Sequence, residues 1–450
     1  MSPSRRDFVV GLGAMLAASR THAAEPAKSD SNRPAKADVM VVGGGTAGTI
    51  AAIQAARLGA RTVLVEAGSQ LGGTTTTAGV DIPGLFHAWG RQVIAGIGWD
   101  LVVKTVELNG NRLPDFTKPV PTHSKHQVRM CGQLYAALAE EACVEAGVEL
   151  RYYESPTSIE KTADGWKVHL VGKGTQADYT VRQLIDTTGN ASVVGMIGLA
   201  RSREATIQPG TLIYRLGGYD LKSLNFTLLE REGKRAFDEG RLRPGDIHQG
   251  GLRGFLGGGG ENAMHIFDAD SSTSVLHTQT NIRGRQSLLR MVRFLKKQPG
   301  MENLRIERLQ PEAGIRETFR IVGRTTITVD DYTSGRHFDD AVAYAFYPVD
   351  LHDAHGVRPK PLAQGVVPTI PLGALIPADS RNLMAAGRSI SSDRLANSAL
   401  RVQASCMAMG QAAGATAALA VQRGATPHEV PIEEVRRTLA KHGAIVPKQG

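Results

Sequence analysis

The chain has 450 residues, of which 42% are hydrophobic, 21% charged and 5% aromatic, and its formal net charge is +9. The basic residues are scattered and no apolar run reaches the roughly twenty residues that cross a bilayer, so we expect no nucleic-acid partner and no membrane span. The three cysteines, Cys131, Cys143 and Cys406, form no CxxC pair, which argues against a redox dithiol, a zinc ribbon or a disulfide scaffold, and no metal is expected.

The first 24 residues resemble a twin-arginine export signal. Ser4-Arg-Arg-Asp-Phe-Val9 carries the arginine pair, a short apolar region follows to Ala18, and Thr21-His-Ala23 is a candidate cleavage site. The alternative is a chance arginine pair at a disordered N-terminus. Residues 25–36, rich in Ser, Pro, Ala and Lys, are typical of a flexible linker. We therefore expect a periplasmic or secreted protein that uses the twin-arginine translocation machinery, which carries folded proteins with their cofactors loaded.

A strand–loop–helix–strand pattern typical of ADP-binding units runs from residue 38 to residue 66. Asp38-Val-Met-Val-Val42 is a predicted parallel strand, and Arg61-Thr-Val-Leu-Val65 is the second. Between them lies Gly43-Gly-Gly-Thr-Ala-Gly48, whose first glycine permits a tight turn, whose third glycine admits a pyrophosphate, and whose last lets helix and strand pack closely. The helix from Thr46 presents amides to the phosphates. Glu66 stands where a carboxylate accepts hydrogen bonds from an adenosine ribose. A glycine-rich turn in another α/β protein is the alternative.

The later elements are less regular. A helix is expected over residues 128–146, and strands over 150–153, 166–171 and 179–185. Residues 250–260 are glycine-dense but lack a leading apolar strand, so they predict a mobile loop and not a second nucleotide site. A last long helix, 402–421, is rich in small residues that allow close contact with the sheet, and a polar terminal helix begins near Ile432.

After Glu66 the sequence continues as Ala67-Gly-Ser-Gln-Leu-Gly-Gly73 and Thr74-Thr-Thr-Thr-Ala-Gly79, small and hydroxyl side chains that suit backbone lying against a flat ring. This extension resembles flavoproteins of the glutathione-reductase-like superfamily, and within it the FAD-dependent oxidoreductase family. The likeness recurs at residues 183–190, 209–218, 314–323, 347–353, 382–391 and 401–414. It implies FAD, and non-covalent FAD because none of the thirteen histidines lies within the glycine-doublet segment.

Two positions depart from the family pattern. Thr46 stands where proline is frequent, and Arg388 replaces an aspartate that holds the flavin in many relatives, so that contact is in doubt or taken over by the guanidinium. The last long helix is expected to follow a turn at Ser389–Ser392 directly, so that the amides at its start stabilise negative charge on the reduced ring. The expected cofactor contacts are Gly43, Gly45, Thr46, Ala47, Gly48, Glu66, Ala67, Gly72, Gly73, Thr74, Thr188, Gly189, Gly387, Arg388, Arg401 and Val402.

These features predict an α/β fold: a Rossmann-like FAD-binding domain, a parallel sheet with a βαβ unit, that carries an inserted mixed α+β substrate domain. The expected division is FAD-binding segments at 37–85, 128–200 and 378–424, a substrate-facing insertion at 86–127, the substrate domain at 201–377, and a C-terminal helix and tail at 425–450.

Candidate proton acceptors are histidines, whose ordinary pKa lies nearest neutrality. His352 and His355 lie in Asp350-Leu-His-Asp-Ala-His355, where Asp350 or Asp353 can orient an imidazole, and His87 follows the flavin-facing loop. These histidines can equally be structural. Arg316 and Arg394 are candidate substrate-binding residues; Arg316 and Arg320 are expected on one face of a strand, where they either clamp an anion or pair with core acids.

The sequence therefore predicts an exported FAD-dependent dehydrogenase or oxidase that transfers hydride from a small polar substrate to FAD. No second strand–GxGxxG–helix unit is visible, so oxygen, a quinone or a redox protein is the expected electron acceptor. Two alternatives stay open: a flavin-dependent reductase of an activated double bond, and an electron-carrying flavin subunit of a larger complex.

Overall fold

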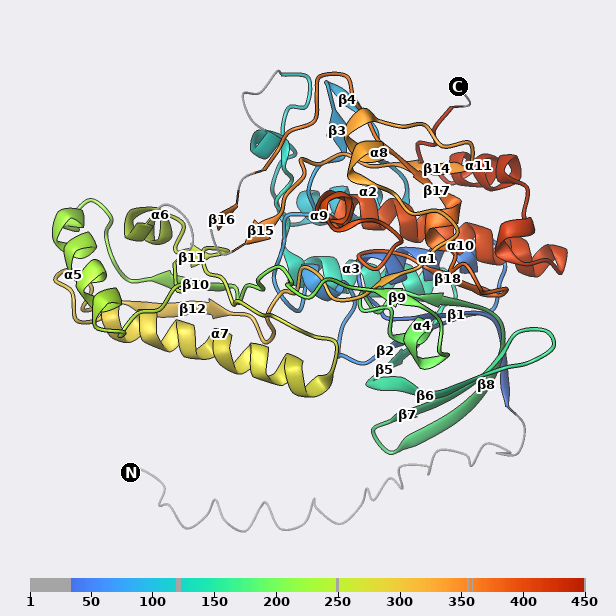
Figure 1. Ribbon diagram of the computed structural model, residues 1–450, viewed down its shortest axis with the longest axis horizontal. Helices are drawn as coiled ribbons and strands as arrows, with labels where there is room; N and C mark the ends of the chain where they lie inside the picture. The colour runs from blue at the N-terminus through green and yellow to red at the C-terminus, as the bar shows by residue number, and fades with distance from the viewer. Residues whose placement is uncertain (1–33, 119–122, 248–250, 354–355, 358, 449–450) are drawn as a thin grey trace, which may run out of the picture.

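A seven-stranded sheet forms the centre of the computed structural model, which describes residues 34–118, 123–247, 251–353, 356–357 and 359–448 (Figure 1). Five strands are parallel. One of these five, the long strand β8, also pairs with an antiparallel meander on one side of the sheet. The parallel strands are β5 (Glu149–Tyr152), β2 (Thr62–Glu66), β1 (Ala35–Val42), β8 (Thr175–Asp186) and β18 (Leu383–Ala385); the meander adds β7 (Trp166–Gly172) and β6 (Glu154–Lys161).

The second half of strand β1, residues 39–42, is apolar, and both of its faces are buried there. Val39 and Val41 belong to the core under the helices, whereas Met40 and Val42 belong to the core on the other face, beside Trp166. A continuous apolar run is what a central parallel strand with two covered faces requires. The predicted β1–helix–β2 unit is confirmed, and β6 was not predicted because its side chains are mostly exposed.

Helices α1 (Thr46–Arg57) and α10 (Gln403–Arg423) pack against each other at unusually close range. A Cβ added to Gly410 or to Gly414 would lie 2.2 Å from the backbone oxygen of Ala47 or Ala51, respectively. The small residues of α10 thus serve a helix–helix contact as well as the expected contact with the sheet. By length and composition α10 could cross a membrane, but 89% of its apolar window is buried in the fold, as in a core helix.

A second lobe has a hydrophobic core of its own, which extends from Leu212 to Ile315 and lies at the left of Figure 1. The prediction of a mobile loop over 250–260 is wrong for the described part, since α6 occupies Gly251–Gly257 and buries Leu252 and Phe255 in this core. Apolar burial outweighs the weak helix propensity of glycine there. The lobe contains β10 (Tyr214–Gly217), β11 (Gly260–Glu261), β12 (Arg305–Leu309), α5 (Phe226–Asp238), α6 and α7 (Ser274–Leu295).

The hydrophobic cores divide the chain differently from the expected 201–377 substrate domain. Buried side chains between Ile327 and Ile376 pack with the first domain, not with the second lobe. Their elements are α8 (Val329–Ser334), β14 (Ala341–Tyr344), β17 (Thr369–Pro371) and the 3₁₀ turn η3 (Leu372–Leu375). Two-residue strands lie nearby: β9 (Arg201–Ser202), β13 (Arg320–Ile321), β15 (His352–Asp353) and β16 (Gly356–Val357).

The expected substrate-facing insertion, 86–127, also lies against the first domain. It contains β3 (His87–Ala88), β4 (Arg91–Gln92), α2 (Ile97–Leu108) and the turn η2 (His123–His126), and α2 packs against α10 and α3. The remaining helices are α3 (Gly132–Glu145), α4 (Ser192–Met196), α9 (Arg394–Leu400) and the confirmed terminal helix α11 (Ile432–Lys441), with short turns η1 (Gly73–Thr75) and η4 (Pro427–Glu429).

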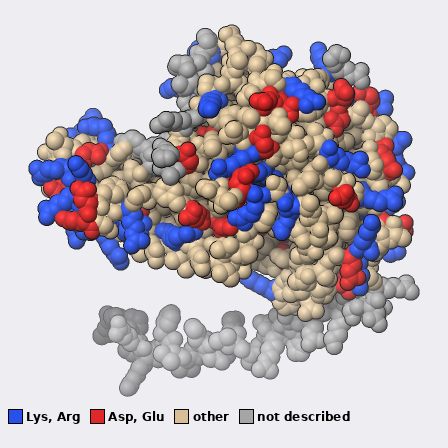
Figure 2. Space-filling view, viewed as in Figure 1, with Lys and Arg blue, Asp and Glu red and all other residues tan. Residues whose placement is uncertain are grey.

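Basic and acidic side chains are interspersed over the face shown in Figure 2, on both lobes. Two local expectations are corrected. Arg316 is not in a strand, because β13 comprises Arg320–Ile321 alone, so the two arginines do not share a strand face. The last long helix does not follow the Ser389–Ser392 turn directly, because α9 intervenes.

Candidate cofactor and substrate site

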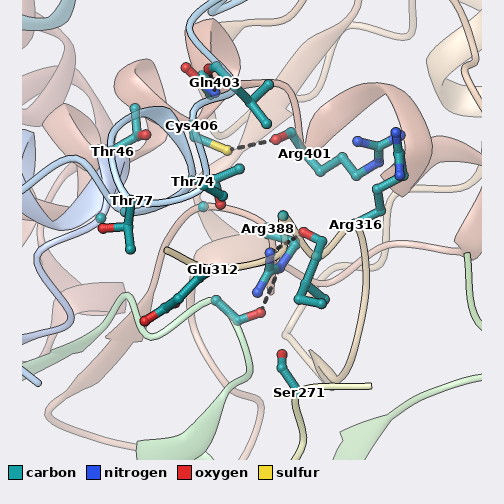
Figure 3. Close-up of a pocket in the computed structure, with 18 of the residues that line it drawn as sticks. Thr46, Thr74, Thr77, Ser271, Glu312, Arg316, Arg388, Arg401, Gln403 and Cys406 are labelled. Atoms are coloured by element: carbon teal, nitrogen blue, oxygen red, sulfur yellow. Dashed lines mark hydrogen bonds between the residues drawn. The ribbon is translucent and has the colours of Figure 1, made fainter. Parts of the chain in front are cut away.

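A cavity of about 830 Å³ lies between the first domain and the second lobe. One part of its wall comes from the glycine loop after β1, the end of β2 and the start of α10; the other part comes from loops of the second lobe and from residues 347–352. Figure 3 shows Thr46 and Thr74 on one side, Arg388 in the middle, and Arg316 and Arg401 together at one end. This end is called the arginine end below.

The three motif glycines of the loop are needed for three different reasons. Gly43 has φ +103°, and an added Cβ would meet the Thr187 carbonyl carbon at 2.7 Å. A Cβ on Gly48 would lie 1.9 Å from the Gly43 oxygen, so that glycine permits the close packing of loop and helix. Gly45, in contrast, would point a Cβ into open space with no atom within 4 Å, and it lines the cavity at the N-terminus of α1. A space next to helix amides that only a missing side chain keeps open fits a pyrophosphate.

Glu66 ends β2 and is held in place by backbone amides. Its two carboxylate oxygens accept hydrogen bonds from Gly44 N and Gly68 N, each at 2.6 Å. Burial raises the pKa of Glu66, and these two hydrogen bonds act in the opposite direction. Carboxylate oxygens have further lone pairs and Glu66 lines the cavity, so the residue can also accept hydrogen bonds from the hydroxyls of an adenosine ribose.

Thr46, which stands at the usual proline position, connects the glycine loop to the second glycine segment. Its hydroxyl lies 3.3 Å from Gly72 O and 3.1 Å from Thr75 Oγ1. Thr75 in turn donates to Gln403 Oε1 at 2.6 Å, at the start of α10. The three segments that surround the cofactor end of the cavity are therefore joined by side-chain hydrogen bonds that a proline could not make.

Arg388 is half-buried and occupies the middle of the cavity wall. It donates to Gly189 O at 2.9 Å, to Asn190 Oδ1 at 3.1 Å and to Ile315 O. Burial lowers the pKa of this guanidinium to about 10, so it remains charged at neutral pH. In place of an acceptor for ribityl hydroxyls, this chain therefore presents a fixed cation that suits a phosphate or another anion.

The arginine end combines charged and polar groups from both parts of the wall. Arg401 Nη2 lies 3.1 Å from Asp350 O and 3.6 Å from Asp350 Oδ2, whereas Arg316 Nη1 donates to Pro209 O at 2.6 Å and Thr211 Oγ1 at 3.0 Å. Arg401 Nε is buried without an acceptor in the part of the chain that the structure describes. A buried donor left without a partner costs about 1–3 kcal/mol. Such a donor fits a site whose ligand supplies the acceptor.

His352 is buried and connects Asp350 with a second histidine. Its Nε2 lies 3.2 Å from Asp350 Oδ2, and its Nδ1 lies 3.1 Å from His265 Nε2. Of the two carboxylates expected to orient it, Asp350 makes the contact. An ionised carboxylate only accepts hydrogen bonds, so His352 Nε2 donates to Asp350 and the Nδ1 of the neutral ring accepts from His265 Nε2. The cavity-lining Asp350 and the imidazole thus form one hydrogen-bonded unit.

Burial determines the charge of this unit. It lowers the pKa of His352 to about 4, although the Asp350 hydrogen bond opposes the shift. Burial alone would raise the pKa of Asp350, but the His352 hydrogen bond and the charges of Arg401 and Arg316 hold it below its ordinary value. Burial raises the pKa of Tyr347 to about 12 and lowers that of Arg316 to about 9, with the Arg401 charge adding to the latter. At neutral pH, Asp350 is therefore an anion and His352 is neutral.

The structure brings most of the expected residues together, but not all. His87 stacks on Phe116 with ring centroids 3.7 Å apart, and it does not line the cavity. Arg394 is also outside the lining and pairs with the buried Glu317 at 2.9 Å. His355 lies outside the described residues. The expected cofactor residues all line the cavity apart from Gly48 and Gly72, which support the loops behind it.

Sequence reasoning missed several residues of the wall. Gln403 adjoins the expected Val402, so its place at the start of a helix was a usable signal. Cys406, one helical turn on, donates to Arg401 O at 3.3 Å, and burial raises its thiol pKa to about 12. His265 carried no signal, because no motif surrounds it and only the fold brings it to His352. Within the described residues, no three His, Cys, Asp or Glu side chains form a candidate metal cluster.

The fold and the cavity define a dinucleotide-binding α/β protein whose cavity has a polar, arginine-lined end. Residues 38–439 match the model of the FAD dependent oxidoreductase family, and the chain belongs to that family. It is therefore an FAD-dependent enzyme, and the open Gly45 cradle with Glu66 at the end of β2 fits the cofactor.

Individual relatives are more distant. The chain is similar to aklavinone 12-hydroxylase DnrF of Streptomyces peucetius subsp. caesius, 30% identical over 191 residues, 38% of this chain and 39% of the relative. It is 45% identical over 56 residues to mitochondrial dihydrolipoyl dehydrogenase of Homo sapiens, covering 12% of this chain and 11% of the relative. The matched segments thus span about two fifths of the hydroxylase and about a tenth of the dehydrogenase. Among solved structures, p-nitrophenol 4-monooxygenase PnpA of Pseudomonas putida DLL-E4 gives a TM-score of 0.42 at 12% identity, over 91% of this chain and 85% of that chain.

Proposed function

We propose that this protein is an exported FAD-dependent dehydrogenase or oxidase that acts on a small polar organic substrate. The observation that supports it is one continuous cavity, which joins the Gly45 cradle to the arginine end. Cofactor-binding and substrate-binding groups therefore share one volume. When bound, FAD supplies the hydride acceptor, and oxygen, a quinone or a redox protein takes the electrons afterwards.

The side chains of the arginine end have separate roles in this proposal. Asp350 and His352 accept the proton that leaves a substrate hydroxyl or amine, because one is ionised and the other neutral at pH 7. Tyr347 lines this end of the cavity, and its hydroxyl accepts a hydrogen bond from Gln127 Nε2 at 2.9 Å. The arginines hold the polar group of the substrate.

The test is anaerobic mixing of the purified, FAD-containing protein with sugars, alcohols, amines and hydroxy acids while the flavin absorbance is followed. Bleaching by one of these compounds supports the proposal. No bleaching with any of them, but rapid reduction by a partner protein, would instead indicate an electron-carrying subunit. Oxidation of chemically reduced protein by an activated alkene, without bleaching by the panel, would indicate a double-bond reductase.

A flavin hydroxylase is the second candidate, favoured by the 30% identity to aklavinone 12-hydroxylase over 191 residues. A hydroxylase needs an external reductant and inserts an oxygen atom into its product. Mass spectrometry of products formed with NADPH under ¹⁸O₂ separates the two candidates, because a dehydrogenase gives no labelled product.

Export is a proposal that rests on the arginine pair within Ser4-Arg-Arg-Asp-Phe-Val9. We expect a fusion of residues 1–36 to a folded reporter to reach the periplasm, and the Arg5→Lys, Arg6→Lys double variant to keep the reporter in the cytoplasm. Equal export of both fusions would contradict the twin-arginine assignment.

A further inference from the structure

The arginine end carries more positive than negative charge. Arg316 and Arg401 lie together there and line the cavity with Asp350. Asp350 is the carboxylate that faces both, and its Oδ2 is 3.6 Å from Arg401 Nη2. The other titratable groups of this end, His352 and Tyr347, are neutral at pH 7 because their pKa values are shifted to about 4 and about 12. Two cations therefore face one anion.

The neighbouring charges do not remove this excess. Arg388, the next guanidinium along the wall, lies in the middle of the cavity and not at the arginine end, and it donates to oxygens of Gly189, Asn190 and Ile315. Glu317, the buried carboxylate that follows Arg316 in sequence, already pairs with Arg394 at 2.9 Å and accepts a hydrogen bond from the backbone N–H of Gln208 at 2.5 Å. Cys406 is a neutral thiol. Among the described residues of this end, one positive charge remains without a counterion.

The donors of the two arginines are fixed and incompletely used. Carbonyl and hydroxyl oxygens of Pro209 and Thr211 hold one end of Arg316, so its guanidinium cannot swing away. Arg401 is held at Nη2 by Asp350 O, while its buried Nε has no acceptor in the described chain. Nε and Nη of one guanidinium form the planar fork that a carboxylate fits with two parallel hydrogen bonds.

We propose that Arg316 and Arg401 bind the carboxylate of a small hydroxy acid, and that such acids are the substrate class of this enzyme. The inference rests on the proposed function, in which the substrate occupies this end of the cavity. A bound monocarboxylate brings the summed charge of Arg316, Arg401, Asp350 and the ligand to zero. A zwitterionic amino acid or an amide would leave the excess cation, and a phosphate dianion would add one negative charge too many.

The experiment uses the FAD-containing enzyme and needs no turnover. Glycolate, lactate and mandelate are titrated against the flavin absorbance, each beside its uncharged amide, and inorganic phosphate is titrated as a competitor. We expect at least one acid to bind tenfold or more tightly than its amide and phosphate to compete weakly. Equal binding of acid and amide, or no binding of any acid, would overturn the carboxylate assignment, and tighter binding of phosphate would do so in favour of a phosphorylated ligand.

Variants locate the site. Arg401→Gln and Arg316→Gln are each expected to weaken acid binding by about 10- to 100-fold, the range of a lost charge-assisted hydrogen bond, with little change for the amide. Arg231→Gln is the matched control, because Arg231 is exposed and pairs with Glu232 at 3.2 Å far from the cavity. Unchanged acid affinity in both cavity variants would refute the site. Wild-type protein that binds no FAD would refute the proposed function instead, so the two failures are distinguishable.

Discussion

At the residue scale, the glycine loop shows that one motif combines positions with different physical demands. Gly43 and Gly48 are required by the protein itself, since added side chains would collide with Thr187 and with the Gly43 carbonyl. Gly45 is not, because a Cβ there meets nothing. Glycine at this position instead leaves space in the cavity for a ligand.

This difference gives a prediction for the apoprotein. Gly45→Ala should change the free energy of unfolding by no more than about 1 kcal/mol, the cost of alanine at a helix N-cap, while FAD affinity falls at least tenfold. Gly43→Ala should destabilise the apoprotein by roughly 1–3 kcal/mol from the clash alone. Urea unfolding and FAD fluorescence titration measure the two quantities. Equal loss of stability in both variants would contradict this account.

His352 makes stability depend on pH. Its folded pKa is about 4 against an ordinary 6.5, so the folded state favours the neutral ring. The contribution is complete above pH 6.5 and is lost as pH falls toward 4, because only the unfolded chain readily binds the proton. A shift of this size corresponds to about 3 kcal/mol.

We therefore expect wild type to lose on the order of 3 kcal/mol more than His352→Gln between pH 7 and pH 4. Urea unfolding at several pH values measures the difference. The pKa of half-buried His87 is also lowered to about 4, but both proteins contain His87, so its contribution cancels in the comparison. His169→Gln on β7, where the ring is partly exposed and bonded to Asp178 at 2.8 Å, is the control. Parallel curves for wild type and His352→Gln would show that the ring is not held neutral by the fold.

At the element scale, burial decides where glycine-rich segments become helices. Residues 251–257 form α6 because Leu252, Phe255 and Leu256 complete the second core. In α10 the glycines have another purpose, since Gly410 and Gly414 let α1 approach. That contact fixes the start of α1, and hence the Gly45 cradle, relative to the start of α10.

Gly410→Ala should accordingly destabilise the protein by roughly 1–3 kcal/mol or more, because its Cβ meets backbone and not a flexible side chain. Gly257→Ala in α6 is the matched control: nothing lies within 4 Å, and alanine favours helix, so stability should be unchanged or slightly higher. Thermal unfolding monitored by circular dichroism compares them. An unchanged melting temperature in Gly410→Ala would exclude the close α1–α10 contact.

At the scale of the whole molecule, two hydrophobic cores meet at one cavity. A ligand that contacts both lobes stabilises both, and by mass action a hundredfold excess over Kd adds about 2.7 kcal/mol. We expect FAD to raise the melting temperature of the apoprotein in a single transition and to be released by heat or acid, as a non-covalent cofactor. Flavin that stays with the denatured chain would contradict non-covalent binding.

The nucleotide-binding unit could be predicted from residues 38–66 alone, because the strand, glycine loop, helix and acidic residue act through local geometry. Most of the residues expected at the cofactor do line the cavity, because their motifs each carry a short-range signal. The arginine end, in contrast, follows from the fold alone. His265 comes from the second lobe, Asp350 and His352 from one short segment, and Arg401 from the turn between α9 and α10. These three segments meet only in the fold, and local patterns carry no information about such contacts. For the same reason His87 and Arg394 were also candidates from the sequence, yet the fold places them in an aromatic cluster and an ion pair outside the cavity.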